Sequence, residues 1–378
     1  MGEKKKKQAT IVDVARAAGV SPSTVSHVLN STSSISDATK QQVIQAVREL
    51  QYVPNTTAKM LRKKRSNIIA LNTQDMTSEY YTIVYERLME RFQKIGYLLI
   101  LLCGKWNEEQ NAKNINSMIE YQAEGLISIG GVQKKELAIA ASKGIKVVLC
   151  DEYDKAFPCV DWNNYETMRS IVNAFCLEGK QRIVYIHANQ HKRQDSTIKR
   201  IAGYRQGMQD NQLTPMDDFF ILSDMESRYY ITNLHFDRFI NRLMEMPKKN
   251  WPEVILCEHD AVANAVTFSL VNAGIRVPED IQVVGFDDTS SSVFSRPTLS
   301  TVWQQPKVLA DAVFAMMKAF LDGEDYPQHI SLSQSVVLRE STTIQPESLE
   351  KAGVIYRLDN EAKSSPQIKK KDKKREDA

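Results

Sequence analysis

The sequence lacks any long apolar run. The longest such run, from Leu98 to Cys103, has the length of one strand, whereas a membrane-spanning helix needs about 20 consecutive apolar residues. The first ten residues, MGEKKKKQAT, are basic and contain no apolar segment of the kind found in signal peptides. We therefore expect a cytoplasmic protein with no membrane partner.

Cysteines are few and do not occur in a motif typical of disulfides or metal sites. The chain has five cysteines, an odd number, and no C-x-x-C motif, which argues against a disulfide framework or a zinc site. Three of them each close an apolar run, as in LILLC, VVLC and VILC, and are predicted to be small buried residues at strand ends: Cys103, Cys150 and Cys257.

The usual catalytic motifs are also missing. No G-x-S-x-G, P-loop or G-x-G-x-x-G motif occurs, and His187 with His191 has no third metal ligand nearby in the sequence. Asp287 and Asp288 could serve as an acid and a base, but adjacent residues on a strand or turn point apart. The sequence therefore predicts no enzyme, no cofactor and no metal site.

Charge is unevenly distributed along the chain. The net charge of the 378 residues is only +3, but residues 1–66 carry +8, residues 67–366 carry −8 and residues 367–378 carry +3. A chain of 378 residues can form two or three domains, and 42% hydrophobic residues suffice for a proper core. A basic N-terminal segment is suited to a polyanion such as DNA, because phosphate neutralisation supplies much of non-specific DNA affinity.

The stretch TIVDVARAAGVSPSTVSHVLN, from Thr10 to Asn30, predicts two short helices and a turn. Gly19 ends the first helix, Ser21 caps the second and Pro22 opens it. The inward residues recur at helical spacing: Ile11, Val14, Ala15, Ala18, Val25, Val28 and Leu29. The outward residues of the second helix are Pro22, Ser23, Ser26 and His27. An ordinary helical hairpin would fit this spacing equally well, and it is the basic charge that favours a helix-turn-helix reading a DNA major groove.

A third helix is predicted from Ser36 to about Gln51, with Val43, Ile44, Val47 and Leu50 on one face. The following segment, YVPNTTAKMLRKKR, contains a helix breaker, Pro54, and a possible helix of two turns. So short a helix is unstable alone in water. A charged linker is the alternative interpretation, but Ala58 and Leu61 on one face favour a hinge helix whose leucine enters a DNA minor groove.

From Asn67 onward, strand-length apolar runs alternate with amphipathic helical stretches, a pattern typical of parallel α/β folds. A break near residues 157–164 suggests two similar lobes. The predicted strands are 68–71, 97–102, 126–129, 147–150, 182–186, 219–222, 254–257, 281–286 and 331–339. The predicted helices reach about residue 95 and then cover 108–121, 135–142, 165–177, 195–211, 230–246, 260–273 and 306–321.

Five motifs in this order resemble the lactose/galactose repressor (LacI/GalR) family of bacterial transcription regulators. They are the helix-turn-helix stretch, YVPNTTAKML, the run from Arg200 to Tyr204, VVGFDDT and VLREST. The resemblance covers roughly residues 9–345. It implies a three-helix DNA-binding headpiece, a hinge helix, and a two-lobed core like the periplasmic sugar-binding proteins, in which the chain crosses three times and two cores form a homodimer.

The expected domains follow from this resemblance. Residues 1–53 form the basic arm and headpiece, 54–66 the hinge helix and linker, and 67–345 the core. The first lobe is expected to contain residues 67–162 and 290–324, and the second residues 163–289 and 325–345. Residues 346–378 lose periodicity and are expected to be a disordered basic tail.

The resemblance also implies DNA contacts. Pro22, Ser23 and His27 match base-reading positions, although the family usually has arginine where His27 stands, and histidine offers fewer directed contacts to guanine. Leu61 matches the hinge wedge and Arg62 a minor-groove contact. The remaining expected contacts to DNA, several of them to phosphates, are Thr10, Ser21, Thr24, Ser26, Asn30, Tyr52, Asn55 and Ala58.

An effector site is implied between the lobes. One cation and two carboxylates, Arg200, Asp151 and Asp287, suit a polyhydroxylated small molecule such as a sugar. They could instead form a salt bridge that holds the lobes, and Trp303 could belong to the core instead of stacking on a sugar ring. The family commonly has Asn-Asp where this chain has His259 and Asp260. The other expected effector contacts are Gln74, Tyr81, His259 and Gln304.

The sequence therefore predicts a dimeric repressor that binds a pseudo-palindromic double-stranded operator and responds to a small-molecule effector. The segment after Pro346 has no leucine heptads, so we expect dimers and not tetramers. A free sugar-binding receptor would have a signal peptide and no basic head. Control by a protein co-effector instead of a sugar stays open.

Overall fold

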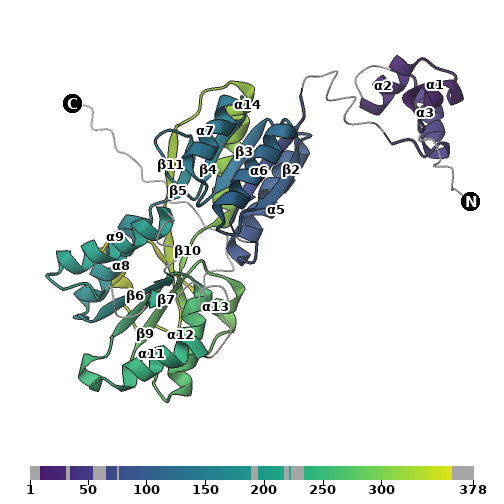
Figure 1. Ribbon diagram of the computed structural model, residues 1–378. Coiled ribbons are helices and arrows are strands. Elements are labelled where there is room, and N and C mark those ends of the chain that lie inside the picture. The colour runs from purple at the N-terminus through teal and green to yellow at the C-terminus, as the bar shows by residue number, and fades with distance from the viewer. Residues whose placement is uncertain are drawn as a thin grey trace, which may run out of the picture. The chain divides into compact units, whose positions relative to one another are not determined.

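The computed structural model describes residues 9–30, 35–53, 65–74, 76–188, 195–216, 221–222 and 234–359, drawn in colour in Figure 1. The chain divides into two units, residues 1–66 and residues 67–378.

The first unit is a bundle of three helices, α1 (Ile11–Ala17), α2 (Pro22–Asn30) and α3 (Asp37–Glu49). Its core is small and consists of Val14, Ala15, Val25, Val43 and Ala46. The predicted helices are confirmed, but the predicted inner face of α3 is partly wrong. Ile44 and Leu50 are exposed by 36% and 37%, whereas Ala46, which was not predicted to face inward, packs in the core with Val43 and beside Val47.

The first lobe of the second unit has a six-stranded sheet of order β11-β5-β4-β3-β1-β2, and all of its strands are parallel. Helices α5 and α14 pack on one face of this sheet, whereas α6 and α7 contact each other and the strands β1 and β4. The strands are β1 (Ile68–Thr73), β2 (Leu98–Cys103), β3 (Gly125–Ile129), β4 (Lys146–Cys150), β5 (Cys159–Trp162) and β11 (His329–Leu332). The helices are α5 (Glu79–Lys94), α6 (Glu108–Glu120), α7 (Lys134–Ser142) and α14 (Pro306–Asp322).

The second lobe has a seven-stranded sheet of order β13-β12-β10-β9-β8-β6-β7, parallel except between β10 and β12. Helices α11 and α12 cover one face, and α8 and α9 the other (Figure 1). Helix α15 packs against α8 on that second face. The strands are β6 (Ile183–Ala188), β7 (Ile221–Leu222), β8 (Val254–Cys257), β9 (Gln282–Phe286), β10 (Ser300–Trp303), β12 (Ser335–Leu338) and β13 (Tyr356–Leu358). The helices are α8 (Asn164–Leu177), α9 (Asp195–Asp210), α11 (Leu234–Met244), α12 (Asp260–Asn272), α13 (Ser290–Phe294) and α15 (Pro346–Lys351), with a 3-10 turn at Lys248–Asn250.

The chain crosses between the two sheets three times, as expected, but the predicted division of the later segments is wrong. The segment 290–303, predicted in the first lobe, ends in β10, which joins the second sheet. Strand β11, predicted in the second lobe as part of one strand over 331–339, pairs with β5 in the first sheet. The crossings therefore follow β5, β10 and β11.

Two strands, β5 and β10, were not predicted because polar residues interrupt their apolar patterns. The predicted break at 157–164 contains β5, which is buried throughout although Asp161 interrupts its apolar pattern. Lys199 and His329 pair with this carboxylate and make its burial tolerable. Strand β10 begins with Ser300 and Thr301, whose hydroxyls are hydrogen-bonded inside the second lobe.

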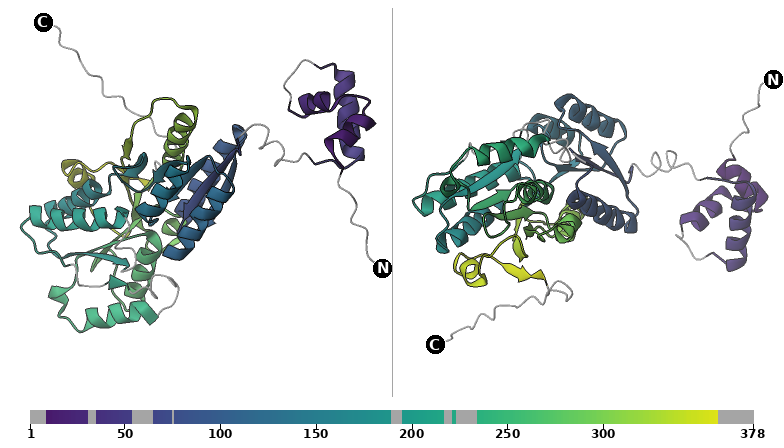
Figure 2. Two further views of the ribbon diagram at one scale, coloured as in Figure 1. Left: turned by 45° about the horizontal axis from the view of Figure 1, so that its top comes forward. Right: turned by 90° about the horizontal axis from the view of Figure 1, so that it is seen from below.

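The prediction of a disordered segment from residue 346 is wrong for residues 346–359. Helix α15 packs through Leu349 on α8, and β13 pairs with β12 at the edge of the second sheet. Both elements are yellow in the right-hand view of Figure 2. They are too short to show a periodicity in sequence. The rest of the predicted tail, residues 360–378, lies outside the described residues.

The three strand-end cysteines lie as predicted at the ends of β2, β4 and β8. Cys150 and Cys257 are buried, Cys103 is half-buried, and each has a free thiol. None of the helices in the described ranges is long and apolar enough to cross a membrane.

Candidate DNA-binding face and effector site

Helix α2 begins with a cluster of hydroxyl groups. The Ser21 Oγ accepts a hydrogen bond from the Thr24 backbone N–H at 3.1 Å, which is the predicted cap. The same Oγ lies 2.7 Å from the Ser23 hydroxyl and 2.8 Å from the Thr24 hydroxyl. The first turn of α2 contains no acidic residue. Hydroxyls and backbone N–H groups at a helix N-terminus suit a phosphate oxygen.

The predicted base-reading residues share one exposed surface. Pro22, Ser23 and His27 are exposed, whereas Ser26 is half-buried. Val25, which lies between them in sequence, is fully buried. Amphipathic spacing thus places Pro22, Ser23 and His27 where a major groove could meet them.

Two other predicted DNA contacts have structural partners in the bundle. Thr10 forms a capping box with Asp13, whose backbone N–H lies 3.3 Å from the Thr10 hydroxyl. The Tyr52 side chain packs against the core of the bundle. The side chain of Asn30 is not described, and four expected contacts in or near the hinge lie outside the described residues: Asn55, Ala58, Leu61 and Arg62.

Asp151 follows strand β4 in a left-handed conformation, with φ of 56°, and is 5% exposed. Its Oδ2 accepts a hydrogen bond from the Tyr81 hydroxyl at 2.8 Å. Its Oδ1 is buried, and no hydrogen-bond partner for it occurs among the described residues. Burial raises the pKa of this carboxyl to about 7, and Arg200 of the second lobe opposes that rise.

Arg200 on α9 is 7% exposed and is held on three sides. Its Nε donates to the Asn164 Oδ1 at 2.9 Å and its Nη1 to the carbonyl oxygen of Glu258 at 2.9 Å. The guanidinium carbon lies 3.6 Å from the centre of the Phe286 ring, a cation–π geometry. These three contacts are to neutral groups, so they leave the charge of Arg200 to act on nearby carboxylates and on a ligand.

A chain of side-chain amides connects the three crossings. Gln304 donates to the Asp287 Oδ1 at 2.6 Å. The Gln334 amide nitrogen lies 3.1 Å from the Gln304 Oε1 and 3.2 Å from the Asn164 Oδ1. Burial raises the pKa of Asp287, and Arg200 opposes this effect. Asp287 and Asp151 are thus both coupled to one arginine.

We define the interlobe site by the seven residues that these contacts bring together. Asn164 and Gln334 were missed in the sequence. The one signal available was that Asn164 follows β5 and Gln334 precedes β12. The apolar pattern predicted no strand at β5 and merged β12 with β11, so this signal could not be used. The site consists of Tyr81, Asp151, Asn164, Arg200, Asp287, Gln304 and Gln334.

Three predicted effector residues have other partners. The His259 Nδ1 accepts from the Val262 backbone N–H at 3.4 Å, as a cap of α12. Gln74 exchanges two hydrogen bonds of 3.1 Å with Asn111. Trp303 is half-buried, and the Arg357 guanidinium covers one face of its ring at 3.6 Å. Each of these three side chains thus has a partner outside the interlobe site, and His259 also lies near enough to Asp287 for its charge to lower the pKa of that carboxyl.

Direct contacts join the lobes beside this site. Glu79 of α5 accepts from the backbone N–H and the hydroxyl of Ser290, at 2.9 and 2.7 Å. Lys199 of α9 donates to Asp161 of β5 at 2.6 Å and pairs with Asp195 at 2.7 Å. The relative position of the lobes thus depends on a few hydrogen bonds and ion pairs, which a ligand can supplement or replace.

A helix-turn-helix unit joined to a two-lobed parallel α/β core, with paired charges between the lobes, defines a DNA-binding regulator with a sensor domain. Comparison with known families agrees with this class. Residues 10–55 match the bacterial regulatory proteins of the lacI family, and residues 172–342 match the periplasmic binding protein-like domain. The chain contains the DNA-binding domain of the lacI family followed by a periplasmic binding protein-like domain, and it is a DNA-binding transcriptional regulator.

Its relatives are transcriptional regulators. The HTH-type transcriptional regulator DegA of Bacillus subtilis is 27% identical over 346 residues, covering 88% of this chain and 98% of the relative. The HTH-type transcriptional repressor PurR of Vibrio atlanticus is 26% identical over 340 residues, with the same coverage. The ribose operon repressor of Haemophilus influenzae is 24% identical over 343 residues, covering 88% of this chain and 98% of the relative.

Solved structures show the same fold. The lac repressor dimer bound to operator and the anti-inducer ONPF matches with a TM-score of 0.76 and 24% identity, over 89% of this chain and 99% of that one. The transcriptional regulator CelR in complex with cellobiose matches with a TM-score of 0.62 and 21% identity, over 88% and 99%.

Proposed function

We propose that this protein is a repressor that binds operator DNA as a homodimer and is controlled by a small polyhydroxylated effector held at the interlobe site. The observation that carries the proposal is the convergence of Asp151, Arg200 and Asp287 from separate segments and from both lobes. An effector that contacts both lobes binds some relative arrangements of the lobes more tightly than others. This difference in binding free energy can alter the affinity for DNA.

The chemistry of the interlobe site favours hydrogen-bond donors on the effector. The Asp151 Oδ1 is a buried acceptor without a partner among the described residues, and a hydroxyl group would satisfy it. Arg200 can act as a donor to a hydroxyl or ring oxygen of the same molecule. Among the relatives, the name of the ribose operon repressor also points to sugars, whereas that of PurR does not, so the site chemistry carries this part of the proposal.

The DNA contacts rest on the exposed surface of α2. Pro22 can offer only apolar contact, for instance to a thymine methyl group, while Ser23 and His27 can form hydrogen bonds to base edges. The hinge segment at 54–66 is proposed to complete the contact in the minor groove through Leu61 and Arg62. Two half-sites about one helical turn apart are expected.

Dimerisation is supported by an apolar surface on the second lobe. Phe268 and Val271 of α12 are exposed by 55% and 45%, and Phe294 of α13 by 80%. The Asn264 amide donates to the Ser291 hydroxyl at 2.9 Å, which joins these two helices along the same surface. A second copy of the chain is the proposed occupant, because two-fold symmetric DNA sites call for a symmetric dimer.

The test combines binding measurements for DNA and for effector. Operators are selected from a random DNA pool, and affinity is then measured by fluorescence anisotropy with and without each of a panel of aldoses, disaccharides, sugar phosphates and purine bases. We expect a neutral sugar to raise the melting temperature and change operator affinity. Asp287→Asn should abolish both effects, and Asp280→Asn, which removes a carboxylate paired with Arg276 and Lys248, should retain them.

Other results would change the conclusion. Unchanged operator affinity with every compound would contradict control by these effectors and favour a protein co-effector. Analytical ultracentrifugation should show a dimer that Phe294→Glu converts to a monomer. A tetramer, or a dimer insensitive to this change, would contradict the proposed surface.

A further inference from the structure

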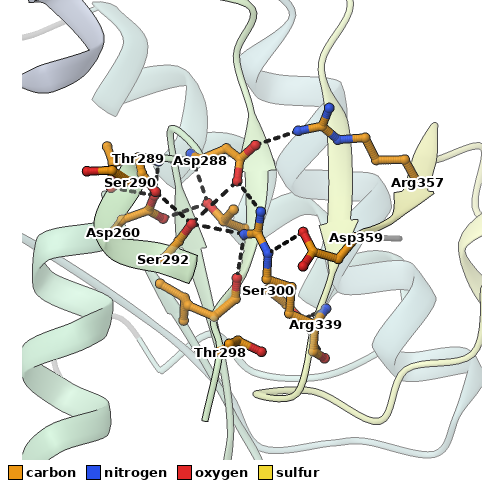
Figure 3. A network of polar contacts seen from close by, with 12 residues as sticks. Asp260, Asp288, Thr289, Ser290, Ser292, Thr298, Ser300, Arg339, Arg357 and Asp359 are labelled. Carbon is orange, nitrogen blue, oxygen red and sulfur yellow. Dashed lines mark hydrogen bonds and ion pairs between the residues drawn. The ribbon is translucent and has the colours of Figure 1, made fainter. Parts of the chain in front are cut away.

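The segment from Asp287 to Ser292 runs from the end of β9 into the first residues of α13, and its residues contact different parts of the molecule in turn. Asp287 belongs to the interlobe site. The Asp288 carboxylate accepts from Arg339 Nη2 at 2.7 Å. The Thr289 backbone N–H donates to Asp260 at 2.7 Å, and Ser290 contacts Glu79 of the other lobe. Figure 3 shows the arginines and the acidic residues gathered around Asp288.

The backbone of this segment is held in an uncommon conformation. Asp287 has φ of 104° and Asp288 has φ of 55°. A positive φ costs free energy for residues other than glycine, and it persists only where the surroundings hold it in place. The side-chain contacts of Asp288 are therefore expected to fix the direction in which its neighbour Asp287 projects.

Arg357, on the C-terminal strand β13, contacts this arrangement at two points. Its guanidinium pairs with the Asp288 Oδ2 and also lies 3.6 Å from the centre of the Trp303 ring. Trp303 precedes Gln304, which donates to the Asp287 Oδ1 at 2.6 Å. Arg357 thus touches the chain neighbours of both partners in the Asp287–Gln304 hydrogen bond.

The same strand end supports the second arginine. The Asp359 Oδ1 accepts from the Arg339 Nε at 2.9 Å, and the Arg339 side chain is only 3% exposed. Arg339 also donates to the Ser292 hydroxyl and to the carbonyl oxygen of Leu299, both at 2.9 Å. Arg339 and Arg357 are thus each held by more than one contact, and the Asp288 carboxylate neutralises part of their positive charge.

A merely structural role for β13 is the alternative. The register of Val336 with Tyr356 and of Leu338 with Leu358 attaches this strand to the sheet through its backbone. The Arg357 side chain is not required for that attachment. Its contacts point instead to the segment that carries Asp287, and it lies beyond the region 172–342 that matches the family domain.

We propose that Arg357 is a positioning residue for the interlobe site, which it acts on through Asp288 and Trp303 without contacting the effector. This inference rests on the proposed function only in taking Asp287 as an effector contact. The C-terminal strand then becomes part of the sensor: it determines whether Asp287 is oriented for binding.

The test is hydrogen–deuterium exchange of the full chain, read by mass spectrometry without any ligand. Backbone N–H groups of Asp287, Thr289 and Ser290 are bonded to groups outside their own segment, so exchange there reports local opening. Arg357→Ala should accelerate exchange over 287–292 by about tenfold, since it removes one partner of a largely buried ion pair. Arg357→Lys, which keeps the charge, should restore most of the protection.

Arg276→Ala is the matched control. Arg276 also pairs with an aspartate of the second lobe, Asp280, but it lies away from the segment, and this variant should leave exchange over 287–292 unchanged. Exchange over β8, residues 254–257, should stay as in the wild type in all variants. If Arg357→Ala does not fold, Arg357→Lys carries the test, with a smaller local increase than the alanine change would give.

Wild-type exchange over 287–292 in both Arg357 variants, or an increase confined to β12 and β13, would overturn the proposal. Because no ligand takes part, this outcome is independent of the sugar panel. A panel without a hit would refute the proposed effector and leave the positioning result intact. Where a sugar does bind, Arg357→Ala should weaken it, and Arg357→Lys should recover part of the affinity.

Discussion

The buried carboxyl of Asp151 makes the stability of the core depend on pH in a way that one substitution should reveal. Burial raises the pKa of Asp151 from its ordinary value near 3.8 to about 7. A carboxyl whose pKa is higher in the folded state binds its proton more tightly there. Its contribution to stability is therefore fully present below about pH 4 and is lost as pH rises through about 7.

The size of the effect follows from the shift. A difference of about three pKa units corresponds to roughly 4 kcal/mol, at about 1.4 kcal/mol per unit, between the protonated and the ionised protein. In the variant Asp151→Asn, the amide that replaces the carboxyl would stay neutral and could still accept from the Tyr81 hydroxyl, as Asp151 does at 2.8 Å. The N–H group of this amide would need an acceptor, at a cost of about 1 kcal/mol.

Urea unfolding of the full chain at pH 5.0 and pH 8.5 measures the difference between wild type and Asp151→Asn. We expect the free energy of unfolding of the variant, relative to that of the wild type, to rise by about 2–4 kcal/mol from pH 5.0 to pH 8.5. Asp280→Asn is the control: salt bridges lower the pKa of Asp280 below its ordinary value, so its ionisation does not change in this range. A difference for Asp151→Asn that is the same at both pH values would refute the reasoning.

Three further changes test other parts of the fold. Ser21→Ala removes the cap of α2 and should lower the stability of the helical head by about 0.5–2 kcal/mol, seen as loss of helical circular dichroism on heating. Gly203→Ala should destabilise the core by about 1–3 kcal/mol in urea unfolding, because a Cβ there would lie 2.2 Å from the carbonyl oxygen of Tyr165; an unchanged midpoint would contradict this packing. Asp311→Asn removes a carboxyl whose pKa Arg91 lowers to about 2. Its contribution is present above about pH 4 and is lost as pH falls through about 2, and solvent screening keeps it below about 1 kcal/mol. The variant should therefore be slightly less stable than wild type at pH 6, and this difference should shrink as the pH falls toward 2.

Elements with strong local signals could be predicted from the sequence. The head helices α2 and α3 carry the predicted caps Ser21 and Ser36, and most core strands are unbroken apolar runs. The lobe assignment of the later segments could not be predicted, because β10 and β11 are short and rich in polar residues. Which sheet accepts each one depends on pairing with residues far away in the chain.

In the candidate site, too, residues with local sequence signals could be predicted, and residues that depend on long-range contacts could not. Asp151, Arg200 and Asp287 could be named because they stand beside recognisable motifs. The amides of Asn164 and Gln334 could not, since their role comes from three crossings that meet only in the folded chain. The environment of Trp303 was equally hidden, because its partner Arg357 lies in a segment without periodicity.

The late position of β11 in the chain has a consequence for folding during synthesis. Strand β5 is an edge of the first sheet until β11 pairs with it at Cys159 through Trp162, and β11 is made only after the strands β6 to β10 of the second sheet. The first lobe therefore leaves the ribosome with an unpaired, apolar edge that is open to association with other chains. Chains that stop before His329 lack β11, together with β12 and β13 of the second sheet, and should aggregate through the exposed edge of β5.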